Sequence, residues 1–429
     1  MLLLISVILF SHYVWASWFD QRYFGAPHLR SKVDLDQDVK SAIDRNIDDL
    51  VKPWIQSGIS EELVNQTFYH FGSHVLFQFY QKKLMLYDPD GYCACNNSVY
   101  GGRNPFFISH LRQCISLVHL FRTLISLEPE LDNLELVVSL DDIPMWLMDN
   151  NDIQQPETVF YPGFGATNCW SKPNFPIPFL SSSQPWDINS YESHVEQIWE
   201  RRQRQRQIQH SHKKRSQVRG NTGRDHRIHK AVFRGNMYKG CSFERDTQVN
   251  FNFNGAFDAS NQNCGRYLLS KIAHNNSQYI DYGLNPLTHW EQSFKYDYVL
   301  NVEGFGGWAD RLFDFFQYGA VILHQSGPCN QWFEPFMKPY QNYIPIAHDF
   351  RDLVGKIIWA QHHPSELEHI RQQSHQFAQD YLSRSAILYY MGRLLNDYRA
   401  LTDYDIVPRN GSVNPDYLFN QTLIQQKCG

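Results

Sequence analysis

Charged residues are scarce in this chain, and beyond one N-terminal run it has no long hydrophobic stretch. Only 19% of its 429 residues are charged, and 44 acidic against 39 basic residues leave a net charge of −5. This near balance gives no global case for binding nucleic acid or an anionic membrane. Because 42% of the residues are hydrophobic, the composition is not that of a disordered chain. The length favours two domains of roughly 150–200 residues each.

The apolar run LLLISVILF, residues 2–10, is too short to span a bilayer. Val14 and Ala16 then supply β-branched and small residues at the two positions that a signal peptidase reads. We therefore expect residues 1–17 to be a signal peptide, with an uncleaved anchor as the alternative. No other stretch approaches 18 apolar residues, so we expect the mature chain to be soluble, without a transmembrane segment.

The cysteines lack the spacing of a zinc site, because the one close pair is C-x-C and no second pair matches it. Disulfides in an oxidising compartment are the preferred interpretation, with no pairing assigned. The eight cysteines are Cys93, Cys95, Cys114, Cys169, Cys241, Cys264, Cys329 and Cys428. Candidate N-glycosylation sequons begin at Asn65, Asn96, Asn275, Asn410 and Asn420. We expect a location in the secretory pathway, in the lumen of the endoplasmic reticulum or Golgi or outside the cell. The final QQKCG is not a usual retrieval signal.

Basic residues are concentrated between residues 200 and 230, where 11 Lys or Arg stand against 2 acids. This stretch has almost no apolar face, and it predicts a solvated segment between two domains. A basic rim that attracts an anionic substrate is the functional alternative. Nucleic acid is disfavoured as a partner, because no aromatic residues interleave the charges. We place the N-terminal domain at 18–195 and the basic linker at 196–230.

Strand and helix signals alternate after this linker. Short apolar runs at 231–235, 296–302, 320–324 and 343–346 predict strands, and two helices are expected to follow the last of them. Such alternation is typical of parallel βαβ units, so a Rossmann-like domain is expected at 231–385, followed by a C-terminal helix and tail at 386–429. Before the linker, residues 60–128 read as mainly helical, and LELVVSL (134–140) reads as a buried strand.

Glycines follow one of these strands directly, at Gly304, Gly306 and Gly307, and a helical pattern with Arg311 comes next. Glycine lets the backbone approach a ligand, and free amides at a helix start favour an anion. The planar fork of an arginine could hold a phosphate there. The spacing is not G-x-G-x-x-G, however, and a simple tight turn between strand and helix remains an equal alternative.

Two further groups of polar residues follow predicted strands. Arg234-Gly235-Asn236 is one, followed by Arg245-Asp246; arginines from two such loops could converge on a diphosphate, or an Arg–Asp pair could be structural. Asp141 and Asp142 end the strand at 134–140, where α/β folds place catalytic groups. A solvated turn or a helix N-cap is the alternative for these two.

Taken in order, these pieces resemble one enzyme family. Cys93-Ala94-Cys95 with a following GGR, VVSLDDIP, VFRGN…ERD, YDYVLNVEGFGGWADRLF, GAVILH and WFEPFMKPYQNYIPI are similar to the capsule-associated-protein and protein O-glucosyltransferase (Rumi-like) family of inverting glycosyltransferases. The similarity runs from about Cys93 to Tyr404. It implies an α/β fold of GT-B type, with two Rossmann-like domains facing across a cleft and C-terminal helices packing back toward the N-terminal domain. It also implies UDP-glucose or UDP-xylose as co-substrate, a protein Ser/Thr or glycan hydroxyl as acceptor, no cofactor and no catalytic metal.

The resemblance also implies roles for single residues. Asp142 falls on the family's general base. Arg245 and Arg311 fall on arginines that would contact the diphosphate. Asn236 falls where the family usually has Ser after Arg234-Gly235. Glu334 falls on an acidic residue with a donor-side role.

Two departures from the family pattern bear on these assignments. The stretch between Arg234-Gly235 and Glu244-Arg245-Asp246 is longer than the pattern, and Asp141 stands where a basic residue is frequent. Two other functions remain open at this point. One is a metal-dependent GT-A-type transferase that uses Ser139-Leu140-Asp141-Asp142 as a metal motif. The other is an inactive lectin or chaperone-like protein of the same fold.

Overall fold

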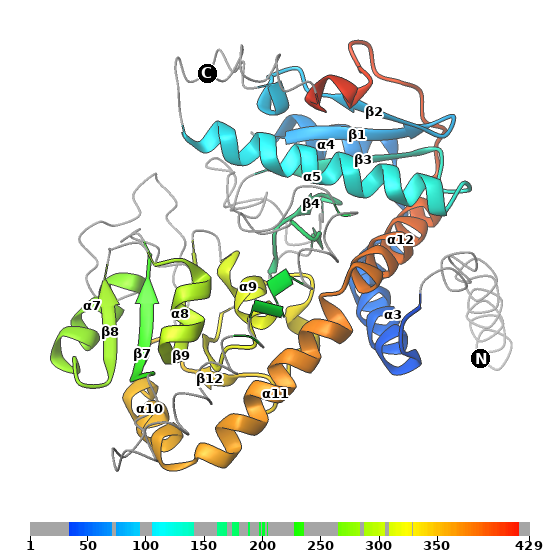
Figure 1. Ribbon diagram of the computed structural model, residues 1–429. Coiled ribbons are helices and arrows are strands. Elements are labelled where there is room, and N and C mark those ends of the chain that lie inside the picture. Colours follow the sequence, from blue (N-terminus) through cyan, green and yellow to red (C-terminus); the bar gives the residue numbers. More distant parts are fainter. Residues whose placement is uncertain are drawn as a thin grey trace, which may run out of the picture.

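The computed structural model describes residues 34–70, 74–94, 105–140, 161–169, 174–179, 188, 197, 198, 200, 201, 204, 227–235, 265–283, 287–304, 309–327 and 329–419. The predicted signal peptide and most of the basic linker at 196–230 lie outside these residues. In the described part the chain forms a mixed α/β structure with two five-stranded sheets and surrounding helices (Figure 1). The α/β class predicted from the sequence is thereby confirmed.

Helices and strands are spread along the whole described part of the chain. In chain order its α-helices are α3 (Gln37–Val51), α4 (Glu61–His70), α5 (Pro105–Leu127), α7 (Gly265–Asn275), α8 (His289–Lys295), α9 (Arg311–Gln317), α10 (Leu353–His362), α11 (Pro364–Tyr381) and α12 (Arg384–Leu401). Its strands are β1 (His74–Tyr80), β2 (Lys83–Tyr87), β3 (Leu134–Ser139), β4 (Phe164–Gly165), β5 (Asn168–Cys169), β6 (Phe175–Pro176), β7 (Ile228–Arg234), β8 (Ile280–Gly283), β9 (Tyr296–Asn301), β10 (Ile322–Gln325), β11 (Cys329–Asn330) and β12 (Ile344–Ile346).

The first sheet has the strand order β2-β1-β3-β4-β6. Strand β1 is antiparallel to both β2 and β3, whereas β3, β4 and β6 are parallel. The expected strand at 134–140 is β3, and all six of its residues are buried. The helical interpretation of 60–128 was wrong for residues 74–87, which form the β1–β2 hairpin. Its turn residues Gln81 and Lys82 have positive φ, where Asn-Gly is the usual sequence signal, and that signal is missing.

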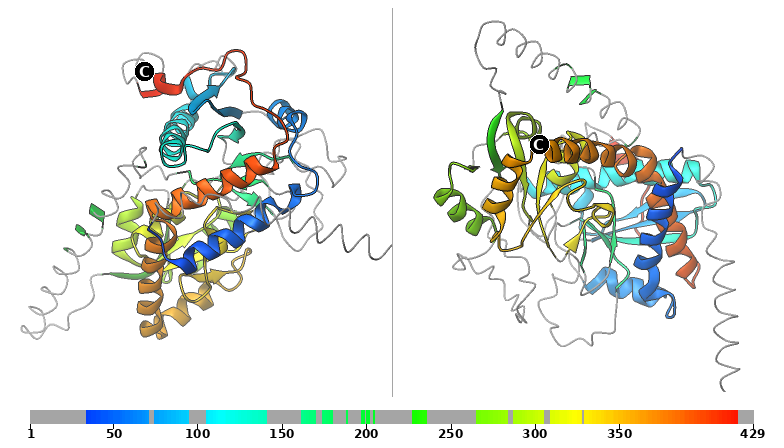
Figure 2. Two further views of the ribbon diagram at one scale, coloured as in Figure 1. Left: turned by 90° about the vertical axis from the view of Figure 1, so that its right-hand side faces the viewer. Right: turned by 90° about the horizontal axis from the view of Figure 1, so that it is seen from below.

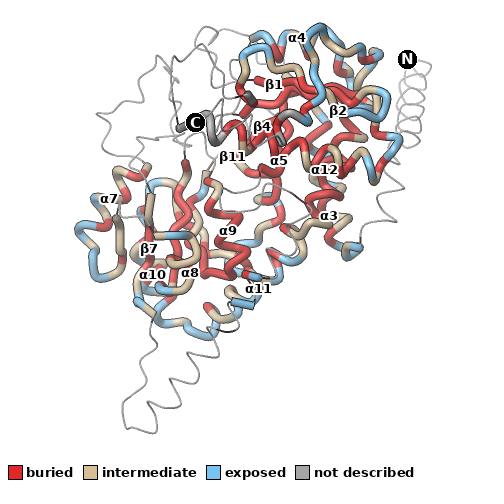
Figure 3. The backbone as a smooth tube through the Cα atoms, turned by 45° about the horizontal axis from the view of Figure 1, so that its top comes forward, coloured by how far each residue is buried: buried red, intermediate tan, exposed pale blue. Residues whose placement is uncertain are grey.

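The second sheet is parallel throughout, with the order β12-β10-β9-β7-β8. All four strands predicted in this half are present. Alternate residues point to opposite faces, as a pleated strand requires: Phe233 and Leu300 lie in a core shared with α7 and α10, while Val232 and Val299 join the core that contains α9. Helices therefore cover both faces, and the strands are buried on each side (Figure 3).

Three helices follow β12, not the two expected. Pro364 starts α11 and ends the run of α10 at His363, because proline is tolerated in the first turn of a helix and not in its interior. Ser383 then caps α12 by accepting a hydrogen bond from the amide of Ala386. Figure 1 shows α11 and α12 running from the second sheet toward the first.

Helix α12 lies beside α3, as both views of Figure 2 show, and most of its residues are buried. The Arg393 guanidinium, only 4% exposed, lies 3.0 Å from a carboxylate oxygen of Asp48 and 3.4 Å from one of Asp44. The Tyr389 hydroxyl donates to Asp44 at 2.9 Å. The hydrophobic core that contains α12 is continuous from the first sheet to one face of the second.

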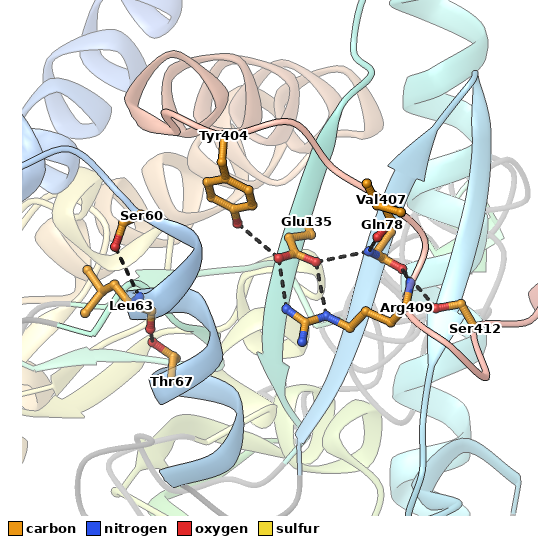
Figure 4. A network of polar contacts seen from close by, with 9 residues as sticks. All are labelled: Ser60, Leu63, Thr67, Gln78, Glu135, Tyr404, Val407, Arg409 and Ser412. Carbon is orange, nitrogen blue, oxygen red and sulfur yellow. Dashed lines mark hydrogen bonds and ion pairs between the residues drawn. The ribbon is translucent and has the colours of Figure 1, made fainter.

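The segment after α12 is fastened across the first sheet by a buried polar network (Figure 4). Glu135 in β3 is 3% exposed and accepts hydrogen bonds from Arg409 at 3.0 and 3.2 Å, from Tyr404 at 3.1 Å and from Gln78 at 3.0 Å. The side-chain oxygen of Gln78 in turn accepts from the amide of Arg409 and the hydroxyl of Ser412. Each buried polar group in this network therefore has partners, which is the condition for burying it at all.

Candidate functional site

The order of strands in the parallel sheet indicates where along its carboxyl edge a ligand would bind. In chain order β7, β8, β9, β10 and β12 are the first to fifth strands, so the sheet order is 2-1-3-4-5 and it reverses between β7 and β9. In open α/β sheets ligands bind outside the carboxyl ends of the strands at such a reversal. The segments that leave the carboxyl ends of these two strands begin with Gly235 and Val302.

Arg311, the first residue of α9, lies at this position and is 8% exposed. Its Nη1 donates to the carbonyl oxygen of Arg234 at 3.2 Å, and its buried Nε has no hydrogen-bond partner. No carboxylate of a described residue lies within ion-pair distance of it. Burial and the charge of Arg266 lower the pKa of the Arg311 guanidinium to about 9. This buried cation would be stabilised by an anionic ligand.

Arg266 is a second buried arginine at the same edge, and no sequence motif pointed to it. It lies in the first turn of α7, the helix that follows β7, and is 6% exposed. Its Nε donates to the carbonyl oxygen of Glu303, just beyond the end of β9, at 3.2 Å. The available signal was positional, because the first turn of a crossover helix lies at the carboxyl edge of a parallel sheet.

The Arg234 side chain binds other groups of the protein, whereas the sequence predicts that it contacts a diphosphate. Its Nη2 donates to a carboxylate oxygen of Asp281 at 2.7 Å, and Nη1 donates to the carbonyl oxygens of Phe233 and Asp281. These contacts tie the carboxyl end of β7 to β8, and they realise the alternative of a structural Arg–Asp pair, with Asp281 as the acid. A diphosphate role for Arg234 stays a prediction.

Gly235 has no side chain, and this leaves space for the guanidinium group of Arg311. A Cβ atom on Gly235 would lie 3.3 Å from Nη1 of Arg311 and 3.2 Å from Cζ of Phe233, closer than side chains normally approach. The absence of a side chain at Gly235 thus allows Arg311 to lie close to the backbone, and a contact of this glycine with a ligand stays a prediction.

Gly304 is buried, three residues after the end of β9. Gly306 and Gly307 lie outside the described residues. The adjacent Glu303 carboxylate lies so close to Gly327, in the loop after β10, that a Cβ there would overlap it at 1.6 Å. The loops after β9 and β10 are thus packed together at the edge of the sheet.

Glu334 lies in a network beside this loop. Its Oε2 is 3.4 Å from Nε2 of His324, and its Oε1 accepts from the backbone amide and side chain of Gln331. The Gln331 side chain also donates to the carbonyl oxygen of Ala309, two residues before Arg311. Both oxygens of the Glu334 carboxylate have protein partners, so this residue supports the loop before α9. Its predicted donor-side role stays a prediction.

Several predicted residues lie outside the described part of the chain. These are Asp142 with its neighbour Asp141, Asn236 and Arg245. Asp142 follows β3, whose last residue Ser139 is fully buried in the parallel part of the first sheet. The chain therefore leaves a parallel strand at its carboxyl end three residues before Asp142.

Three of the five sequons are in the described residues. Asn275, at the end of α7, and Asn410 are exposed. Asn65 in α4 is half-buried, and the hydroxyl of its sequon partner Thr67 is fully buried and donates to the carbonyl oxygen of Leu63 (Figure 4). Asn96 and Asn420 lie outside.

The disulfide interpretation of the cysteines is confirmed for part of the set. Cys93 and Cys114 form a disulfide, and Cys329 is also disulfide-bonded. Among the described residues no group of three or more His, Cys, Asp or Glu side chains could hold a metal ion. Nor does any helix there combine the length and hydrophobicity needed to cross a membrane.

Comparison with known proteins identifies the family. The model of glycosyltransferase family 90 matches residues 41–425. This chain belongs to that family. A segment is 30% identical over 106 residues to protein O-glucosyltransferase 3 of Mus musculus, covering 24% of this chain and 21% of the relative. Human protein O-glucosyltransferase 1 is 24% identical over 123 residues, covering 29% and 31%.

A viral relative extends the range of similar proteins. The uncharacterized protein 179R of Invertebrate iridescent virus 6 is 34% identical over 152 residues, which cover 34% of this chain and 12% of that protein. The chain thus aligns with less than a third of the length of each of these curated relatives. Membership of family 90 rests on the family match, which spans most of the chain and includes β7, α7, β9 and α9 with both buried arginines.

Proposed function

We propose that this family 90 protein is an inverting glycosyltransferase that moves glucose or xylose from a UDP-sugar to a hydroxyl acceptor without a catalytic metal. One observation carries the proposal: Arg311 is a buried cation at the strand-order reversal of a parallel sheet, without a carboxylate partner among the described residues and next to Arg266. A diphosphate would supply a negatively charged partner for Arg311.

The two arginines would act on the leaving group. As the bond between the anomeric carbon and the diphosphate breaks, the diphosphate oxygen gains negative charge. Preorganised donors stabilise that developing charge more than they stabilise the substrate, so they accelerate the reaction. Arg311 and Arg266, with backbone amides at the start of α7, provide such donors. Arg245 stays a candidate for the same role.

Asp142 would be the general base. In an inverting transfer the acceptor hydroxyl attacks the anomeric carbon from the side opposite the departing UDP, and a carboxylate takes the hydroxyl proton. Positioned proton transfer of this kind contributes about 10²–10⁴ in rate. The carboxyl end of β3 supports this assignment, because the corresponding edge of the second sheet carries the arginines.

We further propose a GT-B arrangement, in which residues 18–195 form the acceptor-side domain and residues 231–385 the donor domain. The linker at 196–230 would connect them, and residues 386–429 would return to the N-terminal half. The contacts of α12 with α3 support the last point. For the donor half, the 2-1-3-4-5 parallel sheet with helices on both faces supports a Rossmann-like unit.

For the acceptor we propose a protein hydroxyl, with a glycan hydroxyl as the alternative. Two relatives are named as protein O-glucosyltransferases, which also favours glucose over xylose. The disulfide between Cys93 and Cys114 and the N-terminal apolar run favour the lumen of the secretory pathway or secretion.

The test is UDP release by the secreted, purified chain from a panel of UDP-sugars in the presence of a chelator. Asp142→Asn is the paired variant: it should keep UDP binding, while transfer falls by about 10²–10⁴. Full transfer by this variant would remove Asp142 from the mechanism. Activity that is lost in chelator and restored by a divalent cation would favour a metal-dependent enzyme instead. Saturable UDP binding without turnover on any acceptor would favour the lectin-like function.

A further inference from the structure

We infer that Phe233 is a positioning residue for the diphosphate site: its ring holds the guanidinium groups of Arg266 and Arg311 together before any ligand arrives. This inference rests on the proposed function. Phe233 is fully buried near the carboxyl end of β7, directly before Arg234 and Gly235. It makes no contact with a phosphate in this role, and it acts through the two arginines.

Both guanidinium groups lie over the same ring. The Cζ atom of Arg311 is 4.9 Å from the centroid of the Phe233 ring, and that of Arg266 is 5.6 Å from it. The two arginines come from different helices, α9 and α7, on opposite faces of the sheet. The ring at the end of the strand between them is thus a contact that they share.

The electrostatics give this contact its importance. Two buried guanidinium groups repel each other, and Arg266 is one cause of the lowered pKa of Arg311. The negative face of an aromatic ring attracts a cation, and this attraction is stronger where water is excluded. The Phe233 ring therefore offsets part of the repulsion while the site is empty. It does so without the full negative charge that would compete with a diphosphate.

The surroundings of the ring fix its position. Tyr282 in β8 stacks against it, with ring centroids 5.5 Å apart and an angle of 15° between the planes. On another side Gly235 approaches Cζ of the ring so closely that a Cβ would lie at 3.2 Å. The stacked Tyr282 ring therefore limits the movement of Phe233 on its side, and the Cζ edge of the ring lies where a side chain at position 235 would begin. Its position then sets where both arginines can lie.

The test replaces the ring while keeping an apolar side chain. Phe233→Leu and Phe233→Met, the latter closer in side-chain length, are compared with the original chain for binding of UDP and of uridine, which has no phosphates. We expect UDP affinity to fall roughly tenfold in both variants, as expected for the loss of a buried cation–π contact. Uridine affinity should stay unchanged. In steady-state assays that vary the UDP-sugar concentration, KM should rise more than kcat falls.

A matched control separates this effect from general loss of packing. Phe79→Leu removes an equally buried phenyl ring from the first sheet, where it packs on Phe121. Thermal unfolding should show a comparable destabilisation, with UDP affinity unchanged. Equal losses of UDP and uridine affinity in the Phe233 variants, or no loss in Phe233→Met, would overturn the inference while leaving the proposed function standing. Failure of the original chain to bind UDP would overturn both.

Discussion

Arg311 donates a hydrogen bond from Nη1 to the carbonyl oxygen of Arg234 at 3.2 Å. The first residue of α9 is thereby tied to the last residue of β7, on the two sides of the strand-order reversal. The bond uses the side chain of one arginine and the backbone of the other. The buried Nε of Arg311 is left without a hydrogen-bond partner, whereas the Arg234 side chain is committed to Asp281.

Replacing Arg311 should separate stability from binding. In Arg311→Met an apolar side chain replaces a buried charge, so we expect the thermal midpoint of the empty protein to stay constant or rise. UDP affinity should fall by about 10²-fold, since hydrogen bonds to a charged group are lost. The measurement is the unfolding temperature with and without UDP, because a ligand raises it according to its affinity.

Arg351→Gln is a suitable control for this experiment, because Arg351 has a side chain that is 73% exposed. Neither its unfolding temperature nor its UDP response should change. A strongly destabilised Arg311→Met variant that still responds to UDP would show that the charge serves folding instead of binding.

Arg266→Gln tests which arginine joins Arg311 at the diphosphate. We expect about a tenfold loss of UDP affinity, because one charge-assisted contact is removed. Lys271→Gln, an exposed cation on the same helix, should bind UDP normally. Calorimetry on these variants and on Arg245→Gln ranks the candidates. If Arg245→Gln weakens binding and Arg266→Gln does not, Arg245 is the second arginine at the diphosphate.

Stability should depend on pH through His289. Its Nδ1 lies 2.5 Å from a carboxylate oxygen of the fully buried Asp314, one turn after Arg311 in α9. Burial alone would lower the pKa of His289, but Asp314 and Asp310 together raise it above the usual 6.5. This contribution to stability is present below that value and is lost as the pH rises through the raised pKa. Each unit of the shift is equivalent to about 1.4 kcal/mol.

The measurement for His289 is urea unfolding between pH 6 and pH 9, compared with His289→Asn. The variant should be less stable at pH 6 and should lose less stability as the pH rises. His362→Asn, which removes an exposed histidine at the end of α10, should follow the original chain. Parallel pH profiles for His289→Asn and the original chain would contradict the prediction.

The network around Glu135 should be costly to break. Arg409→Gln leaves a buried carboxylate without its cation, and we expect a loss of about 3 kcal/mol in the free energy of unfolding. Arg122→Gln serves as the comparison, because it breaks an ion pair at the surface: the Arg122 side chain is 35% exposed and that of Asp416 is 61% exposed. The free energy of unfolding should fall by less than about 1 kcal/mol in this variant. When Arg409→Gln is combined with Glu135→Gln, the loss in the free energy of unfolding should be smaller than the sum of the two single losses. Additive costs would show that the two residues are not coupled.

The parallel sheet was the most predictable part of the fold. Its strands are short apolar runs, and Gly319 follows α9 with a positive φ of 56°, a conformation in which glycine commonly ends a helix. The β1–β2 hairpin was not predictable in the same way. HVLFQFY is compatible with a buried helix or a strand, and the Gln81-Lys82 turn carries no glycine or asparagine to decide between them.

The site was predictable to the extent that it depends on single loops. Arg311 follows its glycine turn in the sequence, so a local pattern was sufficient to find it. Arg266 lies at the same place because α7 starts at the carboxyl edge of the sheet, and no motif next to it in the sequence marks it as part of the site. The Phe233 ring under both arginines is a product of packing across three elements, which a local pattern does not encode.

The link between Glu135 and Arg409 also sets an order of events during synthesis. A ribosome releases β1 and β3 hundreds of residues before the segment that carries Arg409 and Ser412. Until then the carboxylate of Glu135 and the amide of Gln78 can obtain these partners only from water. The N-terminal sheet would therefore complete its buried network only after the segment with Arg409 and Ser412 has been synthesised. The N-terminal half is thus synthesised first, but its buried hydrogen bonds should be completed last.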